Sequence, residues 1–187
     1  LDHLEVQDVL AFTGSASTGQ TLRAQKHLIE KSIPINVEAD SLNAAVLGPD
    51  VELGSDAMSL FLREVSKDMT QKTGQKCTAT RRIFVPEARV QDVIAEMSAR
   101  LAEIKIGDPA LTEVGMGPLA TRQQLEDVRA GVKRLREDGE VVFGDADAAL
   151  NPVGGTAGKG FFHPILLYRA KNSAAARWVH SHEVFGP

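Results

Sequence analysis

The chain has 187 residues, of which 43% are hydrophobic, and a formal net charge of −4 at pH 7. This composition is that of an ordinary globular protein, and its mildly acidic balance provides no basic surface for nucleic acid or for an anionic membrane. No apolar run reaches the ~18 residues of a membrane-spanning helix, no signal peptide is visible and a single cysteine fits a reducing compartment, so we expect a cytoplasmic protein.

The first segment predicts a strand, a glycine-containing turn and a helix. Residues 6–12 form an apolar-leaning run, residues 13–19 break it, and Leu22, Gln25 and Ile29 then recur at helical spacing. This order brings backbone N–H groups and a helix N-terminus to one place, which suits a pyrophosphate. An ordinary strand-to-helix turn is the alternative, because the glycine spacing is neither Gly-x-Gly-x-x-Gly nor Walker A.

Two apolar runs follow this helix. Residues 34–38 predict a short buried strand that ends on the carboxylate of Glu38, and residues 42–47 form a second run that Gly48-Pro49 closes. A charged residue at a strand end is common. The position of Glu38 on its strand therefore leaves its role open.

The next elements place the only cysteine on a loop. Between residues 56 and 72 the apolar side chains follow helical spacing, and this helix should end near Gly74. Cys77 is then expected on a loop that precedes a core strand at residues 82–86. We predict that the Arg81-Arg82 pair is a solvated feature of the strand edge and give it no role.

The second half of the chain predicts two amphipathic helices and further strands. The helices cover residues 90–104 and 125–135, the second lying between Thr121 and Gly139, and residues 141–144 form a short strand. Strands that alternate with helices predict an α/β layered architecture with a largely parallel sheet.

Two patterns near the C-terminus resemble binding sites. The glycine-rich residues 154–160 look like a phosphate loop, but they lack the Walker A residues and precede an expected strand at 161–168 instead of opening a helix, so a surface hairpin or loop is favoured. His180 and His182 would share one face of a strand and could hold a metal. No third ligand cluster accompanies them, and we expect no metal site.

Cys77 is the candidate nucleophile. It has no disulfide partner within the chain, and its polar neighbours favour the thiolate, which is the nucleophilic form of the side chain. Most free cysteines are small core residues, so the residues alone leave both readings open.

The surroundings of Cys77 carry a resemblance to a known family. Gly74-Gln75-Lys76-Cys77 has the form of the Gly-Gln-x-Cys active-site signature of the aldehyde dehydrogenase superfamily. Further stretches that are similar to this family follow its order along the chain: Phe12-Thr13-Gly14-Ser15, Glu38, Ile106-Gly107-Asp108-Pro109 with Met116-Gly117-Pro118-Leu119, Gly160-Phe161-Phe162-His163-Pro164, and Glu183-Val184-Phe185-Gly186-Pro187.

The resemblance implies an internal piece of a longer enzyme. There is no initiator Met, and Pro187 stops inside a family motif. Residues 1–40 would be the C-terminal part of the NAD(P)-binding domain, and residues 41–187 an incomplete α/β catalytic domain. The isolated piece should be inactive, because the family's oxyanion Asn, which acts with the backbone N–H of the cysteine, would lie upstream of Leu1.

The same resemblance implies a nucleophile and a general base. Cys77 would add to an aldehyde, and Glu38 would activate the water that releases the acid from the resulting thioester. Glu38 departs from the family in two respects: Ala39-Asp40-Ser41 replaces the usual Leu-Gly-Gly, and the spacing to Cys77, from position 38 to 77, slightly exceeds the usual gap. Both departures weaken the assignment of the family's general base to Glu38.

The implied cofactor is NADP or NAD, with NADP slightly favoured by a subgroup resemblance. Gly14, Ser15 and Gly19 would lie near the phosphates of the dinucleotide. Glu183 would bind the nicotinamide ribose hydroxyls and Phe185 would pack against the nicotinamide, and both would point the same way from an extended segment.

Within the superfamily, residues 37–43 and 74–86 look most similar to a bacterial subgroup of aromatic degradation. Its members oxidise semialdehydes carried on coenzyme A in phenylacetate and benzoate catabolism. We therefore expect an aldehyde substrate, possibly linked to coenzyme A, and a homodimer or homotetramer at full length. A cysteine hydrolase or acyltransferase and a non-catalytic interaction domain are the alternatives.

Overall fold

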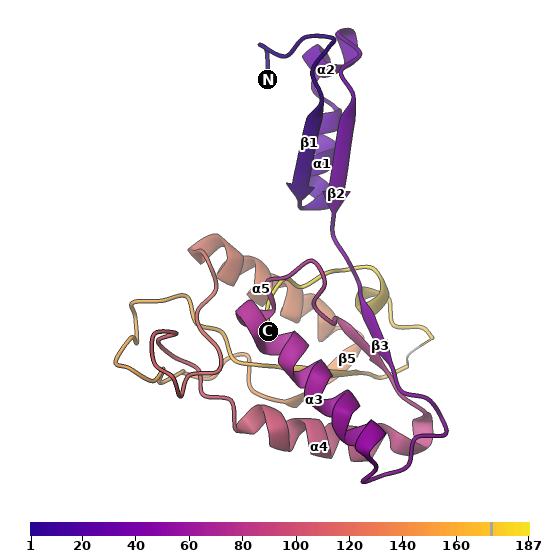
Figure 1. Ribbon diagram of the computed structural model, residues 1–187, viewed down its shortest axis with the longest axis vertical. Helices are drawn as coiled ribbons and strands as arrows, with labels where there is room; N and C mark the ends of the chain where they lie inside the picture. Colours follow the sequence, from indigo (N-terminus) through magenta and orange to yellow (C-terminus); the bar gives the residue numbers. More distant parts are fainter. Residues whose placement is uncertain (173) are drawn as a thin grey trace. The chain divides into compact units, whose positions relative to one another are not determined.

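The computed structural model describes residues 1–172 and 174–187 (Figure 1). The chain divides into two compact units, Leu1–Ser41 and Leu42–Pro187, each with its own strands and helices. The fold is of the mixed α/β class, as predicted.

The first unit is a parallel strand pair with a helical crossover. Its elements are β1 (Leu10–Gly14), α1 (Ala16–Arg23), α2 (Lys26–Glu30) and β2 (Ile35–Ala39). β1 and β2 pair in parallel, from Leu10 opposite Ile35 to Gly14 opposite Ala39. The predicted strand at 34–38 is confirmed in place, but its side chains alternate between exposed and half-buried and none is fully buried.

The predicted break at residues 13–19 is wrong in its second half, because α1 already begins at Ala16. Ser15 caps this helix through its hydroxyl oxygen, which accepts a hydrogen bond from the Thr18 N–H. Gly19 lies buried within the helix, where a Cβ would come 2.6 Å from a Val37 methyl group. This glycine serves close packing of helix on strand and does not mark a turn.

The second unit opens with a parallel βαβ unit. Its strands are β3 (Ala44–Val46) and β4 (Arg82–Phe84), paired in parallel, and the crossover helix is α3 (Asp56–Thr70) with a short 3₁₀ helix, η1 (Gln71–Gly74), behind it. Ser55 caps α3 by accepting from the Met58 N–H. The prediction of a helix that ends near Gly74 and of Cys77 on a loop is confirmed.

The rest of the unit adds two helices and an antiparallel strand pair. They are η2 (Glu87–Arg89), α4 (Val90–Ala102), α5 (Arg122–Leu135), β5 (Gly139–Phe143), β6 (Leu167–Ala170) and η3 (Trp178–His180). Both predicted helices are confirmed, and Thr121 caps α5 as expected. The strand expected at 161–168 is shorter, since β6 begins only at Leu167 and Phe161 forms an isolated bridge with Leu119.

The described strands form three separate pairs, two parallel and one antiparallel, where a single largely parallel sheet was expected. Both parallel pairs come from chain segments joined through a helix, as parallel pairing requires. The sequence pattern alone does not show that β5 and β6 run in opposite directions, because a long irregular connection lies between them.

The main core of the second unit lies between α3 and α4, which run side by side (Figure 1). Leu62 of α3 and Met97 and Leu101 of α4 are almost completely buried. A smaller apolar cluster joins Val128 and Val132 of α5 to Leu119, which precedes this helix. None of the described helices is long and apolar enough to cross a membrane.

His163 is a polar residue buried in this unit, with 1% of its surface exposed. Its Nδ1 lies 2.8 Å from the Pro164 carbonyl oxygen, and its Nε2 has no hydrogen-bond partner among the described residues. Burial lowers the pKa of His163, because the imidazolium would lose its hydration, and the positive charge of Arg129 acts in the same direction.

The lowered pKa of His163 predicts acid destabilisation. The His163 side chain binds a proton more readily in the unfolded chain than in the folded protein. The free energy of unfolding is therefore not reduced by this residue above the ordinary histidine pKa of about 6.5, and it decreases as the pH falls from there through the pKa of the folded state. Urea unfolding of the full-length protein at pH 7.5 and 5.5 should show a smaller loss of stability for His163→Gln than for wild type. His3→Gln, at an exposed position, should behave as wild type, and equal losses in all three proteins would contradict the prediction.

Candidate active site

Cys77 is exposed on a loop that joins η1 to β4, and we call residues 74–80 the thiol loop. The chain enters this loop through a sharp reversal. Lys72, Thr73 and Gly74 have positive φ angles of 54°, 59° and 69°, the left-handed conformation that glycine adopts without strain. Three such residues in succession end the helix and direct the chain back toward β4.

Asp68 of α3 holds the thiol loop on both sides of the cysteine. One carboxylate oxygen lies 2.5 Å from Lys76 Nζ, and the other accepts hydrogen bonds from the Thr80 N–H at 2.5 Å and the Thr80 hydroxyl at 2.8 Å. Burial acts to raise the pKa of Asp68, but the hydrogen bonds from Lys76 and Thr80 outweigh it and lower the pKa. The Lys76 ammonium, expected to favour a thiolate, is therefore engaged by a carboxylate.

Asn43 fixes the backbone of the loop from the β3 side. Its Nδ2 donates to the carbonyl oxygen of Cys77 at 2.7 Å and to that of Ala79 at 3.3 Å. Sequence reasoning missed this residue, since an Asn beside a short strand has no distinctive pattern.

The residues just before Cys77 contact another stretch that carried the family resemblance. The Thr73 hydroxyl donates to the carbonyl oxygens of Gly117 and Pro118 at 3.0 and 3.2 Å. The Gln75 side-chain oxygen accepts from the Ala120 N–H at 3.0 Å. The connection between α4 and α5 is thereby attached to the thiol loop.

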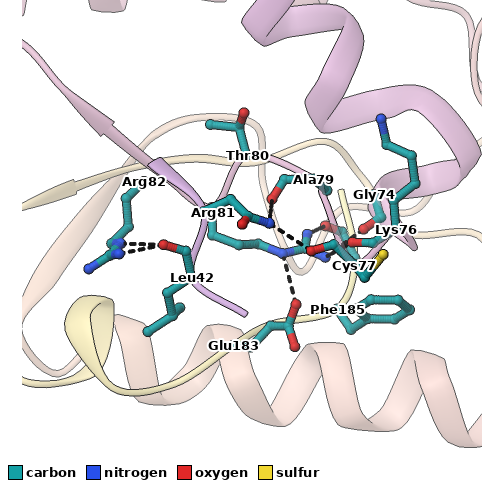
Figure 2. Close-up of polar contacts among 12 residues, drawn as sticks. Leu42, Gly74, Lys76, Cys77, Ala79, Thr80, Arg81, Arg82, Glu183 and Phe185 are labelled. Atoms are coloured by element: carbon teal, nitrogen blue, oxygen red, sulfur yellow. Dashed lines mark hydrogen bonds and ion pairs between the residues drawn. The ribbon is translucent and has the colours of Figure 1, made fainter. Parts of the chain in front are cut away.

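The prediction that Arg81 and Arg82 form a solvated pair is wrong. The Arg81 side chain is only 8% exposed and donates to the Gly74 and Gly186 carbonyl oxygens at 2.7 and 3.0 Å (Figure 2). Arg82 donates from two of its nitrogens to the Leu42 carbonyl oxygen. The Arg81 side chain is therefore buried, and Arg82 is half-buried.

The last residues of the chain lie against the thiol loop through two glycines. A Cβ on Gly74 would overlap the carbonyl group of Gly186, and a Cβ on Gly186 would come 2.6 Å from a Val128 methyl group of α5. The Gln124 side chain of α5 also donates to the Phe185 carbonyl oxygen at 2.7 Å. This backbone contact requires glycine at both positions.

Glu183 and Phe185 both reach Arg81 (Figure 2). A Glu183 carboxylate oxygen lies 3.4 Å from Arg81 Nε, and the Arg81 guanidinium carbon lies 5.3 Å from the centre of the Phe185 ring. The two side chains therefore share one partner, Arg81. Burial lowers the pKa of Arg81 and the Glu183 charge opposes this shift.

The other predicted site residues belong to the first unit. Gly14 ends β1 and Ser15 caps α1, so the hydroxyl of Ser15 is already used within the helix turn. Glu38 is exposed on β2 opposite Thr13, at the carboxyl ends of the parallel strands.

An acidic side chain also lies at the N-terminus of α1. Asp40 has a positive φ of 45°, and its Oδ1 accepts a hydrogen bond from the Ala16 N–H at 3.0 Å. The departure Ala39-Asp40-Ser41 thus has a structural role, because Asp40 caps this helix together with Ser15.

Residues 2–187 match the sequence profile of the aldehyde dehydrogenase family. The chain belongs to this family. It is 43% identical over its whole length to a 3,4-dehydroadipyl-CoA semialdehyde dehydrogenase of Aromatoleum evansii and 25% identical over 96% of its length to an aldehyde dehydrogenase family 7 member A1 of Malus domestica. It spans 36% and 32% of these relatives, about a third of their length.

Solved structures of the family share the fold. A betaine aldehyde dehydrogenase of Staphylococcus aureus in complex with NAD⁺ matches 96% of the chain with a TM-score of 0.82 at 20% identity. An aldehyde dehydrogenase C variant of Pseudomonas syringae, crystallised with NAD⁺ and octanal, matches with a TM-score of 0.79 at 22% identity. The chain covers 33% and 34% of these two proteins.

The histidines near the C-terminus are engaged with aromatic rings. His180 belongs to η3 and stacks on Phe84 with ring centres 6.2 Å apart, and His182 meets the Trp178 ring edge-on at 6.0 Å. The strand on which a metal pair would need to lie is replaced by this 3₁₀ turn. Among residues 1–172 and 174–187, no group of three or more His, Cys, Asp or Glu residues could hold a metal.

The two-sided contact of Asp68 predicts that this residue stabilises the protein and restrains the thiol loop. Asp68→Asn removes the charge that holds Lys76 and should cost about 1–3 kcal/mol of unfolding free energy. In the full-length protein, trypsin should then cleave after Lys76, whose side chain is 15% exposed in the intact loop.

The matched control is Glu64→Gln on the same helix. Glu64 forms a surface pair with Arg63, so this change should alter stability by less than about 0.5 kcal/mol. Similar trypsin cleavage after Lys76 in wild type and Asp68→Asn would show that Asp68 does not hold the loop.

Proposed function

We propose that the full-length protein oxidises an aldehyde to a carboxylic acid with NAD(P)⁺ through a thioester on Cys77. The observation that carries this proposal is an exposed thiol on a loop that Asp68, Asn43 and Arg81 fix, in a chain of the aldehyde dehydrogenase family. A fixed loop suits a nucleophile, since the attacking atom must be held in a defined geometry.

The first chemical step is addition. The Cys77 thiolate adds to the aldehyde carbon, the carbonyl π electrons pass to the oxygen, and this oxyanion requires hydrogen-bond donors, of which the Cys77 N–H is the local candidate. When bound, the nicotinamide accepts the hydride. Collapse of the oxyanion then restores the C=O bond and leaves the acyl group on the Cys77 sulfur.

The second step releases the acid. Glu38 takes a proton from water, the resulting hydroxide attacks the thioester, and the Cys77 thiolate leaves. The overall balance is aldehyde, water and NAD(P)⁺ to carboxylic acid, NAD(P)H and a proton. The division of the chain at Ser41 and Leu42 supports the assignment of residues 1–40 to the dinucleotide-binding domain and 41–187 to the catalytic domain.

The residues that would hold the dinucleotide have suitable chemistry. The Glu183 carboxylate, which faces Arg81, is of a type that accepts hydrogen bonds from ribose hydroxyls, and the Phe185 ring is of a type that packs against a nicotinamide. Gly14, Ser15 and Gly19 would line the phosphate side. The family resemblance slightly favours NADP, although the solved relatives contain NAD⁺.

The substrate we propose is a semialdehyde linked to coenzyme A. The 43% identical relative is named as a 3,4-dehydroadipyl-CoA semialdehyde dehydrogenase, which supports a substrate of aromatic-compound degradation. We further propose a homodimer or homotetramer at full length.

The role of Cys77 is tested by removing its thiol. In the full-length protein, Cys77→Ala should abolish aldehyde oxidation while dinucleotide affinity, measured by fluorescence titration, stays nearly unchanged. A hydrolase would cleave thioesters yet show no dinucleotide-dependent oxidation in the unmodified protein, and that outcome would replace the proposed function. Substantial turnover by Cys77→Ala would remove the thiol from the mechanism.

The role of Glu38 separates the two steps. Glu38→Gln cannot take the proton from water, so rapid mixing should give a burst of about one reduced dinucleotide per site, followed by very slow turnover. Intact-protein mass spectrometry should show the acyl group on the protein. Normal steady-state turnover would contradict the assignment.

A further inference from the structure

Arg81 uses all three guanidinium nitrogens inside the protein (Figure 2). Nη2 donates to the carbonyl oxygens of Gly74 at 2.7 Å and Lys76 at 3.4 Å, both in the thiol loop. Nη1 donates to the Gly186 carbonyl oxygen at 3.0 Å, and Nε faces Glu183 at 3.4 Å. One side chain thus contacts the thiol loop on one side and residues 183–186 on the other.

The contact with Lys76 sets the direction of a backbone donor at the nucleophile. The Lys76 carbonyl and the Cys77 N–H belong to one planar trans peptide and point in opposite directions. Arg81 Nη2 and the Ala79 N–H, at 3.4 and 3.2 Å, both hold this carbonyl oxygen. The Cys77 N–H is consequently directed away from Arg81.

The contacts with residues 183–186 fix the position of the residues proposed to bind the nicotinamide. The Glu183 side chain is only 10% exposed, and Arg81 faces both its carboxylate and the Phe185 ring. The close approach of Gly74 to Gly186 leaves no room for either segment to shift toward the other. A buried charge pair of this kind fixes orientation more than it adds stability.

We propose that Arg81 is a positioning residue of the oxidation, which aligns the Cys77 nucleophile with the nicotinamide-binding residues Glu183 and Phe185. The inference rests on the proposed function and extends it to a residue outside the reacting groups. Arg81 acts through the Gly74, Lys76 and Gly186 carbonyl groups and needs no contact with the substrate.

The shape of arginine is necessary for this task. A planar guanidinium donates in several fixed directions at once, whereas a lysine ammonium is a compact charge on a flexible stem. Arg81→Lys keeps the charge beside Glu183 but cannot span Gly74, Lys76 and Gly186 together. Arg82→Lys is the matched control, because Arg82 contacts the Leu42 carbonyl, His180 and the Phe84 ring, all of which lie outside residues 74–76 and 183–186.

The experiment compares wild type, Arg81→Lys, Arg82→Lys and Glu183→Gln in the full-length protein, with propionaldehyde as the probe. Single-turnover hydride transfer should slow about 10-fold or more in Arg81→Lys, which corresponds to about 1.4 kcal/mol. The kcat should fall accordingly, while KM for the aldehyde and the thermal unfolding midpoint stay close to those of Arg82→Lys. Glu183→Gln weakens the same junction and should slow hydride transfer as well.

Non-additivity provides a second criterion. Since Arg81 and Glu183 share one contact, the double variant should be slowed by less than the product of the two single effects. Hydride transfer in Arg81→Lys at the rate of Arg82→Lys, or full additivity of the two changes, would overturn the proposal. If Arg81→Lys does not fold, Arg81→Gln takes its place in the same comparison: transfer at the rate of Arg82→Lys would overturn the proposal, and slowed transfer would support it.

The proposed function and the role of Arg81 fail in different ways. No hydride transfer by the wild-type protein with any aldehyde would reject the function. The effect of Arg81 on the thiol loop would then be tested by the rate at which iodoacetamide alkylates Cys77. An alkylation rate that changes several-fold in Arg81→Lys but not in Arg82→Lys would support the proposal that Arg81 positions the thiol loop. Equal alkylation rates would overturn it.

Discussion

The arrangement of the candidate site depends on one backbone contact, between Gly74 and Gly186. These residues approach so closely that a Cβ on Gly74 would overlap the Gly186 carbonyl, and Gly186 in turn lies against Val128 of α5. The end of the chain is thereby fixed against the start of the thiol loop. Arg81 can bridge both segments only because their carbonyl groups are held side by side.

Around this contact, stretches that are far apart in the sequence are attached to a single loop. α3 contributes Asp68, the segment before β3 contributes Asn43, and Thr73 and Gln75 attach the connection that precedes α5. These attachments are made by polar side chains, most of them to backbone groups. Such a hold keeps Cys77 exposed and still restricts its backbone.

Local patterns in the sequence predicted most of the fold. The period of apolar residues gave α3, α4 and α5, and the left-handed Gly74 gave the loop that carries Cys77. The role of Arg81 could not be predicted, because its partners Glu183 and Gly186 are distant in the chain and a pair of arginines usually remains in solvent. The place of Gly19 within α1, and not in a break of the chain, could not be predicted for a similar reason: its close neighbour is Val37, on a strand that follows later. The antiparallel pairing of β5 and β6 also depends on contacts that no local window contains.

The acid at the start of α1 has a consequence for ligands. Asp40 already occupies the Ala16 N–H, and Ser15 occupies the Thr18 N–H. An anion that approaches these amides must displace the Asp40 carboxylate, which is held close to them because Asp40 directly follows β2. The protein therefore carries its own competitor, and apparent affinity for a phosphate group at this turn is reduced by the fraction of molecules in which Asp40 is bound.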